Sequence, residues 1–113
     1  MTLSSRDVII RTEDIEKAAA FYEHTLGLTV FQRNAQMIGL ETGAFRLFLD
    51  RGPPHGAVFD FYVDDLNAAK AKLVAAGCRI EEEDPSRLRC YLSDPFGLTF
   101  NIEQRSVNPQ SGG

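Results

Sequence analysis

The sequence predicts an α+β fold in which two βαβββ modules form a curved mixed sheet with a concave cleft and with both helices on its convex side. Three observations lead to this prediction. The segment that begins at Asp7 resembles the segment that begins at Val58, and a repeat of about half the chain is typical of a duplicated module. Each copy opens with an alternating run, followed by an alanine-rich stretch with helical spacing. Further alternating runs, typical of half-buried strands, close each copy.

Eight strands are expected from the alternating runs, four in each module. Module one carries them at about 6–12, 28–33, 36–41 and 45–50, and module two at about 58–63, 78–82, 88–93 and 98–104. Residues Asp94–Gly97 form a turn between the last two strands. The acidic run Glu81–Asp84 is interpreted as a solvated loop.

Each helix has a predicted start, an apolar stripe and an end. Asp14 and Asp65 can cap the helices by accepting hydrogen bonds from free backbone N–H groups. Gly27 and Gly77 suit the left-handed position just past a helix end. The stripes are Ile15, Ala18, Tyr22 and Leu26 in module one, and Leu66, Ala69 and Leu73 in module two. Phe21 is also expected in the core.

Length and composition indicate a single domain over residues 1–113. The chain has 113 residues, of which 43% are hydrophobic and 25% are charged, an ordinary globular composition. We expect module one at about 6–50, a linker at 51–56, module two at about 57–105 and a mobile tail at 106–113. The linker contains Pro53 and Pro54, and consecutive prolines cannot join a strand ladder.

Charge, hydropathy and cysteine content exclude several classes of function. The formal net charge of −4 argues against nucleic-acid binding, because phosphate contacts need clustered lysine and arginine. No apolar run approaches the roughly 18 residues that span a bilayer, and the opening segment lacks the apolar stretch of a secretory signal. Cys78 and Cys90 form no CxxC motif and are interpreted as free thiols. We therefore expect a cytoplasmic protein with no nucleic-acid and no membrane partner.

Alternation along the strands assigns two faces to the predicted sheet. One set of residues is apolar and is expected to pack under the helices. The opposite face mixes apolar and aromatic residues with charges, as small-molecule sites do. Its candidate ligand-binding residues are Asp7, Ile9, Arg11, Arg46, Phe48, Val58, Asp60, Tyr62, Asn101 and Glu103. The carboxylates would favour a cationic or hydrogen-bond-donating ligand, with Asn101 orienting it.

Two segments resemble the signatures of a known superfamily. Residues 14–28 resemble the signature D-x-x-x-A-x-x-F-Y-x-x-x-L-G of the vicinal-oxygen-chelate superfamily, and residues 94–102 resemble its second signature, D-P-x-G-x-x-x-E-L. This superfamily includes glyoxalase I, extradiol dioxygenases, fosfomycin-resistance enzymes and bleomycin-resistance binding proteins. The resemblance covers residues 7 to about 104 and is specific for the fold. It says less about the reaction, because this fold hosts several chemistries.

The resemblance implies four positions where metal-using members hold a divalent ion. In this sequence the four positions are Asp7, Phe48, Val58 and Asn101. Phenylalanine and valine have no donor atom, and one carboxylate with one amide cannot replace three or four ligands. The chain is therefore expected to hold no metal ion and no cofactor.

Two alternatives to this mapping stay open. A register shift of two at Phe48 would place Arg46 or Asp50 at that position. Three carboxylates of the same face, those of Asp7, Asp60 and Glu103, could rebuild a cation site. Arginines on that face make ion pairing the simpler role for these acids.

The sequence therefore favours a metal-independent small-molecule binding protein similar to the bleomycin-resistance proteins, with a small organic molecule in the cleft. The alternative is a glyoxalase-like lyase or isomerase, or a dioxygenase, with an atypical or rebuilt metal site. A third hypothesis is a module whose sheet face binds another protein. The sequence assigns no catalytic residue and leaves open whether the chain is an enzyme. A homodimer is expected, because members of the superfamily commonly dimerise.

Overall fold

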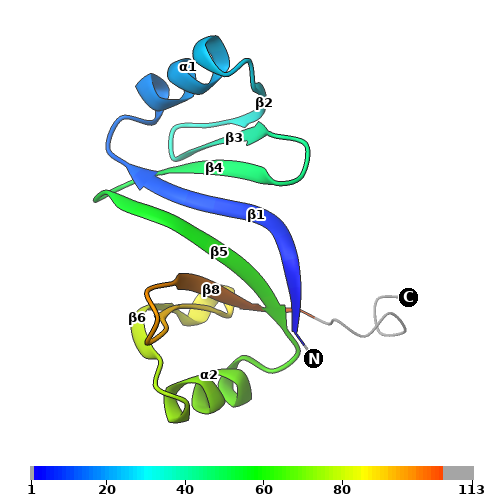
Figure 1. The fold of residues 1–113 in the computed structure, drawn as a ribbon, viewed down its shortest axis with the longest axis vertical. Coiled ribbons are helices and arrows are strands. Elements are labelled where there is room, and N and C mark those ends of the chain that lie inside the picture. Colours follow the sequence, from blue (N-terminus) through cyan, green and yellow to red (C-terminus); the bar gives the residue numbers. More distant parts are fainter. Residues whose placement is uncertain (1, 106–113) are drawn as a thin grey trace. The chain divides into compact units, whose positions relative to one another are not determined.

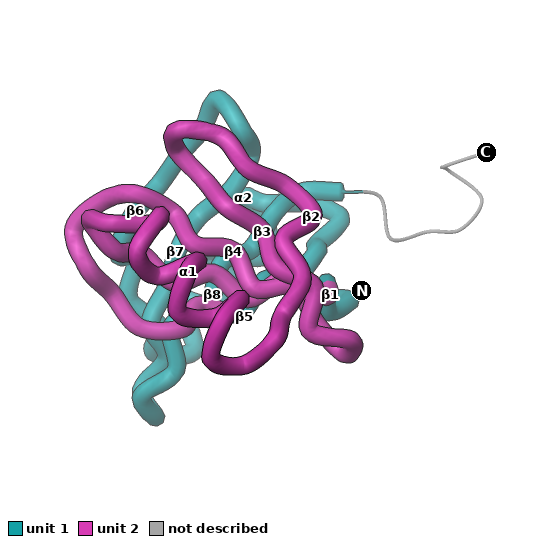
Figure 2. Tube along the Cα trace, turned by 90° about the horizontal axis from the view of Figure 1, so that it is seen from above, with its two compact units in different colours: residues 1–5, 59–113 teal, residues 6–58 magenta. Residues whose placement is uncertain are grey.

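The computed structural model describes residues 2–105. The chain divides into two compact units, shown in Figure 2: unit 1 contains residues 1–5 and 59–113, and unit 2 contains residues 6–58. The tail predicted at 106–113 lies outside the described residues.

The described residues contain the two helices and eight strands that the alternation predicts (Figure 1). The first repeat contains β1 (Thr2–Thr12), α1 (Ile15–Thr25), β2 (Thr29–Arg33), β3 (Met37–Glu41) and β4 (Arg46–Arg51). The second contains β5 (His55–Val63), α2 (Leu66–Ala75), β6 (Arg79–Asp84), a short 3-10 helix (Pro85–Arg87), β7 (Arg89–Ser93) and β8 (Thr99–Gln104). The α+β class and the repeated βαβββ order are confirmed.

Strand pairing is mixed in both units. Unit 2 has the order β2-β3-β4-β1, and unit 1 has the order β5-β8-β7-β6. The pairs β1–β4 and β5–β8 are parallel, whereas the remaining pairs inside each unit are antiparallel. Ile9 pairs with Phe48, and Asp60 pairs with Asn101. Ile9 and Asp60 are equivalent in the repeat, so Phe48 is the counterpart of Asn101, as the sequence alignment of the modules predicts.

Apart from shifts of one or two residues, three segments differ from the sequence prediction. β1 begins at Thr2, four residues earlier than expected, and His55 and Gly56 belong to β5 instead of the linker. His55 and Gly56 have backbone N–H groups that can donate hydrogen bonds to a strand ladder, whereas the two prolines before them have none. The acidic run 81–84 forms the end of β6, not a loop. β6 is the edge strand of unit 1, where charges discourage pairing with another chain.

Both helices begin and end at the predicted residues. The Oδ1 atoms of Asp14 and Asp65 accept hydrogen bonds from the backbone N–H groups of Lys17 and Ala68, each at 3.0 Å. These caps satisfy donors that the first helical turn leaves without partners. Gly27 and Gly77 take φ angles of 71° and 107°, which favour glycine at the helix ends.

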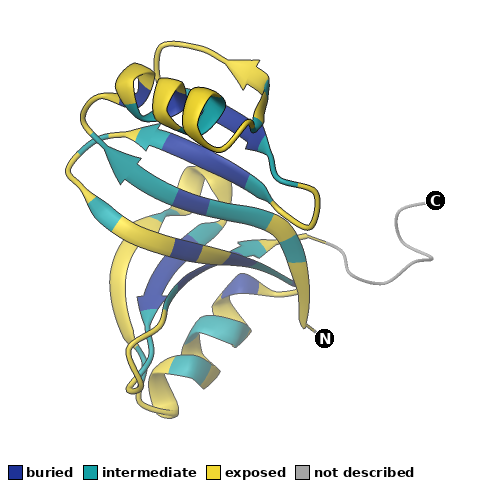
Figure 3. Ribbon diagram, turned by 45° about the horizontal axis from the view of Figure 1, so that its top comes forward, coloured by how far each residue is buried: buried dark blue, intermediate teal, exposed yellow. Residues whose placement is uncertain are grey.

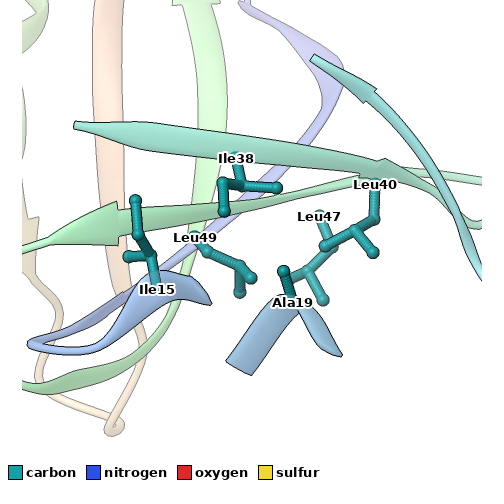
Figure 4. Close-up of a cluster of buried hydrophobic side chains, with 6 residues drawn as sticks. All are labelled: Ile15, Ala19, Ile38, Leu40, Leu47 and Leu49. Atoms are coloured by element: carbon teal, nitrogen blue, oxygen red, sulfur yellow. The ribbon is translucent and has the colours of Figure 1, made fainter. Parts of the chain in front are cut away.

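The core of unit 2 lies between α1 and the strands β3 and β4 (Figure 4). Its buried residues are Ile15, Ala19, Ile38, Leu40, Leu47 and Leu49, with Tyr22 packed against them. Two expectations for this stripe are wrong. Phe21 is 54% exposed, because it lies one residue, about 100°, away from the stripe around the helix. Leu26 is 60% exposed because it is the C-cap residue, past the last helical turn.

The core of unit 1 lies between α2 and the strands β5, β7 and β8. Its buried residues are Val63, Leu66, Cys90, Leu92, Phe100 and Ile102, and Phe61, Ala69, Leu73 and Cys78 pack against them. The predicted stripe of α2 is therefore confirmed. In both units the helix covers the apolar set of strand residues, so the mixed set occupies the opposite, helix-free face. Three consecutive residues are buried in the middle of each of β3, β4, β7 and β8, and Figure 3 shows these buried stretches between partly buried strand ends.

Candidate functional site

Charged residues on the helix-free face of unit 2 form pairs across β1 and β4. Asp7 and Arg46 are partners in the strand register, and the Arg46 Nε donates to Asp7 Oδ1 at 2.7 Å. Arg11 and Asp50 are partners in the same ladder, and the Arg11 Nε lies 3.3 Å from Asp50 Oδ2. Opposite charges at directly opposed positions stabilise a sheet. Three of these four residues, Asp7, Arg11 and Arg46, are predicted binding residues, and all four support the local strand pairing.

An apolar patch lies on the same face of unit 2. Ile9 and Phe48 are ladder partners and are only 6% and 9% exposed. The Phe31 ring packs edge-to-face on Phe48, with 5.7 Å between the ring centroids. The Arg46 guanidinium lies 5.6 Å from the centroids of both rings, within range of a cation–π contact. Ile9, Arg46 and Phe48 are predicted site residues, and the structure brings them together.

Phe31 is a residue of this face that the sequence reasoning missed. The strand register shifts between Val30 and Gln32, so Phe31 lies at an irregularity where simple alternation fails. Its ring fits because Gly39 has no side chain: a Cβ at Gly39 would lie 2.7 Å from Phe31 Cζ. A glycine inside a strand often marks such a close approach, and this was the available signal.

The helix-free face of unit 1 contains a buried polar pair. Asp60 and Asn101 are ladder partners, and the Asn101 Nδ2 donates to Asp60 Oδ1 at 2.7 Å. Asp60 is 4% exposed and Asn101 is 1% exposed. The Asn101 Oδ1 is buried and has no hydrogen-bond partner among the described residues. A buried acceptor without a donor costs about 1–3 kcal/mol, so this atom requires an explanation.

The other predicted residues of this face surround the polar pair within the same strands. Tyr62 and Glu103 are ladder partners, and the Arg105 guanidinium lies 4.6 Å from the centroid of the Tyr62 ring. Arg105 also lies 3.4 Å from the Glu103 carboxylate. Val58, two residues before Asp60 on β5, is the last residue of unit 2 and is 1% exposed. Tyr62 and Glu103 therefore add an aromatic ring and a carboxylate to the helix-free face of unit 1.

Tyr91 is the second residue that the sequence reasoning missed. It is the ladder partner of Asn101 on β7 and is 7% exposed, so it shares the face of the polar pair. Its neighbours Cys90 and Leu92 belong to the core beneath α2. Alternation along β7 could have assigned Tyr91 to the helix-free face. Burial raises the pKa of the Cys90 thiol, so that thiol is a core group and not an activated nucleophile.

A comparison with protein families shows to which family the chain belongs. The family model of the glyoxalase-like domain matches residues 7–103. The chain belongs to the glyoxalase-like domain family. The match includes both signature segments, and the predicted resemblance to the vicinal-oxygen-chelate superfamily is confirmed. No curated protein matches the chain.

Solved structures similar to this glyoxalase-like domain confirm the fold. A hypothetical protein from Bacillus halodurans aligns with a TM-score of 0.65 and 12% identity, over 95% of this chain and 96% of that one. A benzaldehyde dehydrogenase structure from Legionella pneumophila aligns with a TM-score of 0.68 and 14% identity, over 88% and 98%. A variant of homoprotocatechuate 2,3-dioxygenase from B. fuscum aligns with a TM-score of 0.63 and 21% identity, over 94% of this chain but 33% of that one. Identities this low indicate a shared fold and not a shared reaction.

The residues at the four positions that the resemblance assigns to a metal ion do not fit such an ion. Phe48 and Val58 have no donor atom, the Asp7 carboxylate pairs with Arg46, and the Asn101 amide donates to Asp60. Over residues 2–105, no group of three or more His, Cys, Asp or Glu side chains is arranged to hold an ion. No helix of that part of the chain is long and apolar enough to cross a membrane.

Proposed function

We propose that this glyoxalase-like domain is a metal-independent binding protein for a small organic molecule. The ligand contacts the helix-free face of unit 1, where it donates a hydrogen bond to the Asn101 Oδ1. The ligand is a molecule with an N–H or O–H group, or a cationic nitrogen, on an apolar framework. The single observation that carries this proposal is the buried Asn101 oxygen without a partner.

The geometry of the polar pair gives the Asn101 oxygen a defined direction. The Nδ2 group is held by the Asp60 carboxylate at 2.7 Å, so the amide cannot rotate without losing that hydrogen bond. The oxygen is therefore a fixed acceptor beside a buried carboxylate. A donor that reaches it removes the cost of an unsatisfied buried acceptor, and a charge-assisted donor gains more.

The chemistry of the donor set supports binding without a metal. The superfamily's metal positions carry a phenyl ring, an isopropyl group, a carboxylate paired with arginine and an amide paired with aspartate. Apolar side chains at two of these positions provide contact area for an organic ligand in place of coordination. Six further candidate ligand-binding residues lie in unit 2 and stay predictions from the sequence; they are Asp7, Ile9, Arg11, Arg46, Phe48 and Val58.

The test is a ligand screen by thermal unfolding in the presence of EDTA. We expect a cationic or N–H-bearing organic molecule to raise the unfolding temperature of the wild-type protein. The Asn101→Leu variant should bind that molecule about threefold to tenfold more weakly, because a net hydrogen bond is lost. Asn67→Leu is the matched control, since Asn67 is exposed on α2. Equal affinity in wild type and Asn101→Leu would refute the role of the Asn101 oxygen.

The alternative function is that of a glyoxalase-like lyase or isomerase, or of a dioxygenase, with a rebuilt metal site. The two hypotheses predict different effects of EDTA on the stabilisation of the protein by its ligand. An enzyme with a rebuilt site would lose ligand-induced stabilisation when the metal is removed, whereas the proposed binding protein keeps it.

A further inference from the structure

We infer that unit 1 holds a second small-molecule site beneath α2, on the opposite side of the strands from Asn101, for a carboxylic acid with a short apolar chain or a single ring. The structure contains a cavity of about 340 Å³ there. It is lined by Thr2, Phe61, Val63, Ala69, Lys72, Leu73, Ala76, Phe100 and Ile102. Cavities of roughly 300 Å³ and above are large enough for small ligands. This site is independent of the proposed function.

The internal repeat explains why a cavity forms in unit 1. The repeat aligns Leu73 of α2 with Tyr22 of α1, and Tyr22 packs against the core of unit 2. In α1 the residues Ile15 and Ala19 are both fully buried, whereas α2 has Leu66 as its only buried residue. A leucine fills less space over the strands than the tyrosine does at the equivalent position. α2 therefore covers its strands less completely than α1 covers its own.

The floor of the cavity is apolar and aromatic. Phe61 and Phe100 pack edge-to-face, with 5.7 Å between the ring centroids, and both side chains line the cavity. Phe100 is 8% exposed and Ile102 is 2% exposed, so the floor belongs to the buried core. An apolar chain or ring placed there would gain contacts that the small side chains of α2 do not supply.

Lys72 gives the cavity a charged rim that selects an anion. Its side chain lines the cavity, and it forms no ion pair or hydrogen bond with another described residue. A smaller cavity of about 230 Å³ shares Lys72 and is also lined by Asp64 and Asp65. The Asp65 carboxylate already accepts a hydrogen bond from the start of α2. The Lys72 ammonium group is the cation that would meet the carboxylate of a ligand in the larger cavity.

The first test uses sodium octanoate as the probe and follows amide and methyl NMR signals of the whole chain. We expect saturable shifts that centre on Leu73, Phe100 and Ile102. In Leu73→Tyr, which places the side chain of Tyr22 at the equivalent position, the affinity should fall about tenfold or more because the ring occupies the cavity. Absence of saturation, shifts centred elsewhere, or unchanged affinity in a folded Leu73→Tyr protein would overturn the inference.

The second test examines the charge and does not depend on the folding of Leu73→Tyr. Lys72→Gln should weaken octanoate binding about threefold, because an exposed ion pair contributes modestly, and should leave binding of octanol unchanged. Lys17→Gln on α1 is the matched control and should bind octanoate as the wild type does. Equal octanoate affinity in Lys72→Gln and Lys17→Gln would overturn the assignment of a carboxylate to this site.

Discussion

At the scale of single residues, equivalent positions of the two repeats carry opposite chemistry. The pair Ile9 and Phe48 in unit 2 corresponds to the pair Asp60 and Asn101 in unit 1. The first pair is apolar, whereas the second is a buried carboxylate and amide joined by a 2.7 Å hydrogen bond. The duplicated framework keeps the strand positions but not the side chains. One repeat therefore contributes apolar surface and the other contributes a fixed acceptor.

The two cysteines should differ in reactivity. Both are free thiols, but Cys90 is buried and Cys78 is partly exposed. Burial raises the pKa of the Cys90 thiol above its ordinary value of 9.0, so the thiolate form is disfavoured in the folded protein. We expect a thiol reagent at neutral pH to label Cys78 first and Cys90 only after unfolding, as mass spectrometry of the labelled protein will report.

The sign of the pH dependence follows from the raised pKa. The contribution of Cys90 to stability is fully present below the ordinary pKa of 9.0 and is lost as the pH rises through the folded pKa, because the unfolded thiol ionises first. Cys78→Ser is the control, and its native form should take up no label. Labelling of native Cys90 as fast as Cys78 would contradict this assignment.

At the scale of elements, the two helices are specified by local signals and differ in how well they cover their strands. Both have an aspartate cap and a glycine with positive φ near the C-terminal end. Their sheet-facing residues differ, since α1 buries Ile15 and Ala19 and α2 buries Leu66 alone. The two repeats therefore have the same local signals for helix formation, but they differ in the side chains that pack between helix and strands.

Removing either cap should destabilise the protein by a similar amount. Asp14→Ala and Asp65→Ala should each lower the free energy of unfolding by about 1 kcal/mol, because one backbone donor of the first turn loses its acceptor. Chemical denaturation monitored by circular dichroism measures the change. Asp65→Asn is the control and should be close to wild type, because asparagine caps as well as aspartate does. A full loss of stability in Asp65→Asn would show that the carboxylate has another role.

At the scale of the whole molecule, the chain has the glyoxalase-like fold, whereas the absence of a metal ion stays a prediction from the sequence. The family match covers residues 7–103, yet two of the four superfamily metal positions carry side chains without donor atoms. The homodimer, the cytoplasmic location and the small-molecule partner remain predictions from sequence.

The folded protein should be indifferent to divalent metal ions. Addition of Zn²⁺, Ni²⁺ or Mn²⁺, or of EDTA, should leave the unfolding temperature unchanged, because an ion that binds the native state would raise it. Elemental analysis of the purified protein is the second measurement and should find less than stoichiometric metal. A stoichiometric ion whose removal lowers the unfolding temperature would favour the enzyme hypothesis.

Spacing along the chain was enough to predict the repeat, both helix caps, the apolar stripe of α2 and the two faces of each module. Helical and strand periodicity and helix-capping residues can be recognised directly in a sequence, because they depend on residues that are close along the chain. Phe31 was not predicted as a site residue, because the register shift between Val30 and Gln32 interrupts the alternation from which the strand faces are assigned. Phe21 and Leu26 were wrongly expected in the core. Phe21 lies one residue away from the apolar stripe of α1, and Leu26 is the C-cap residue, past the last helical turn.

The hydrogen-bond partners of buried polar atoms and the positions of cavities become visible only in the folded chain. Asp60 and Asn101 lie 41 residues apart, and their hydrogen bond depends on the register of β5 against β8. The orphaned Asn101 oxygen and the cavity beneath α2 likewise arise from packing between distant segments. Such contacts are set by how side chains of different volume fit together in three dimensions, and local sequence patterns do not encode that fit.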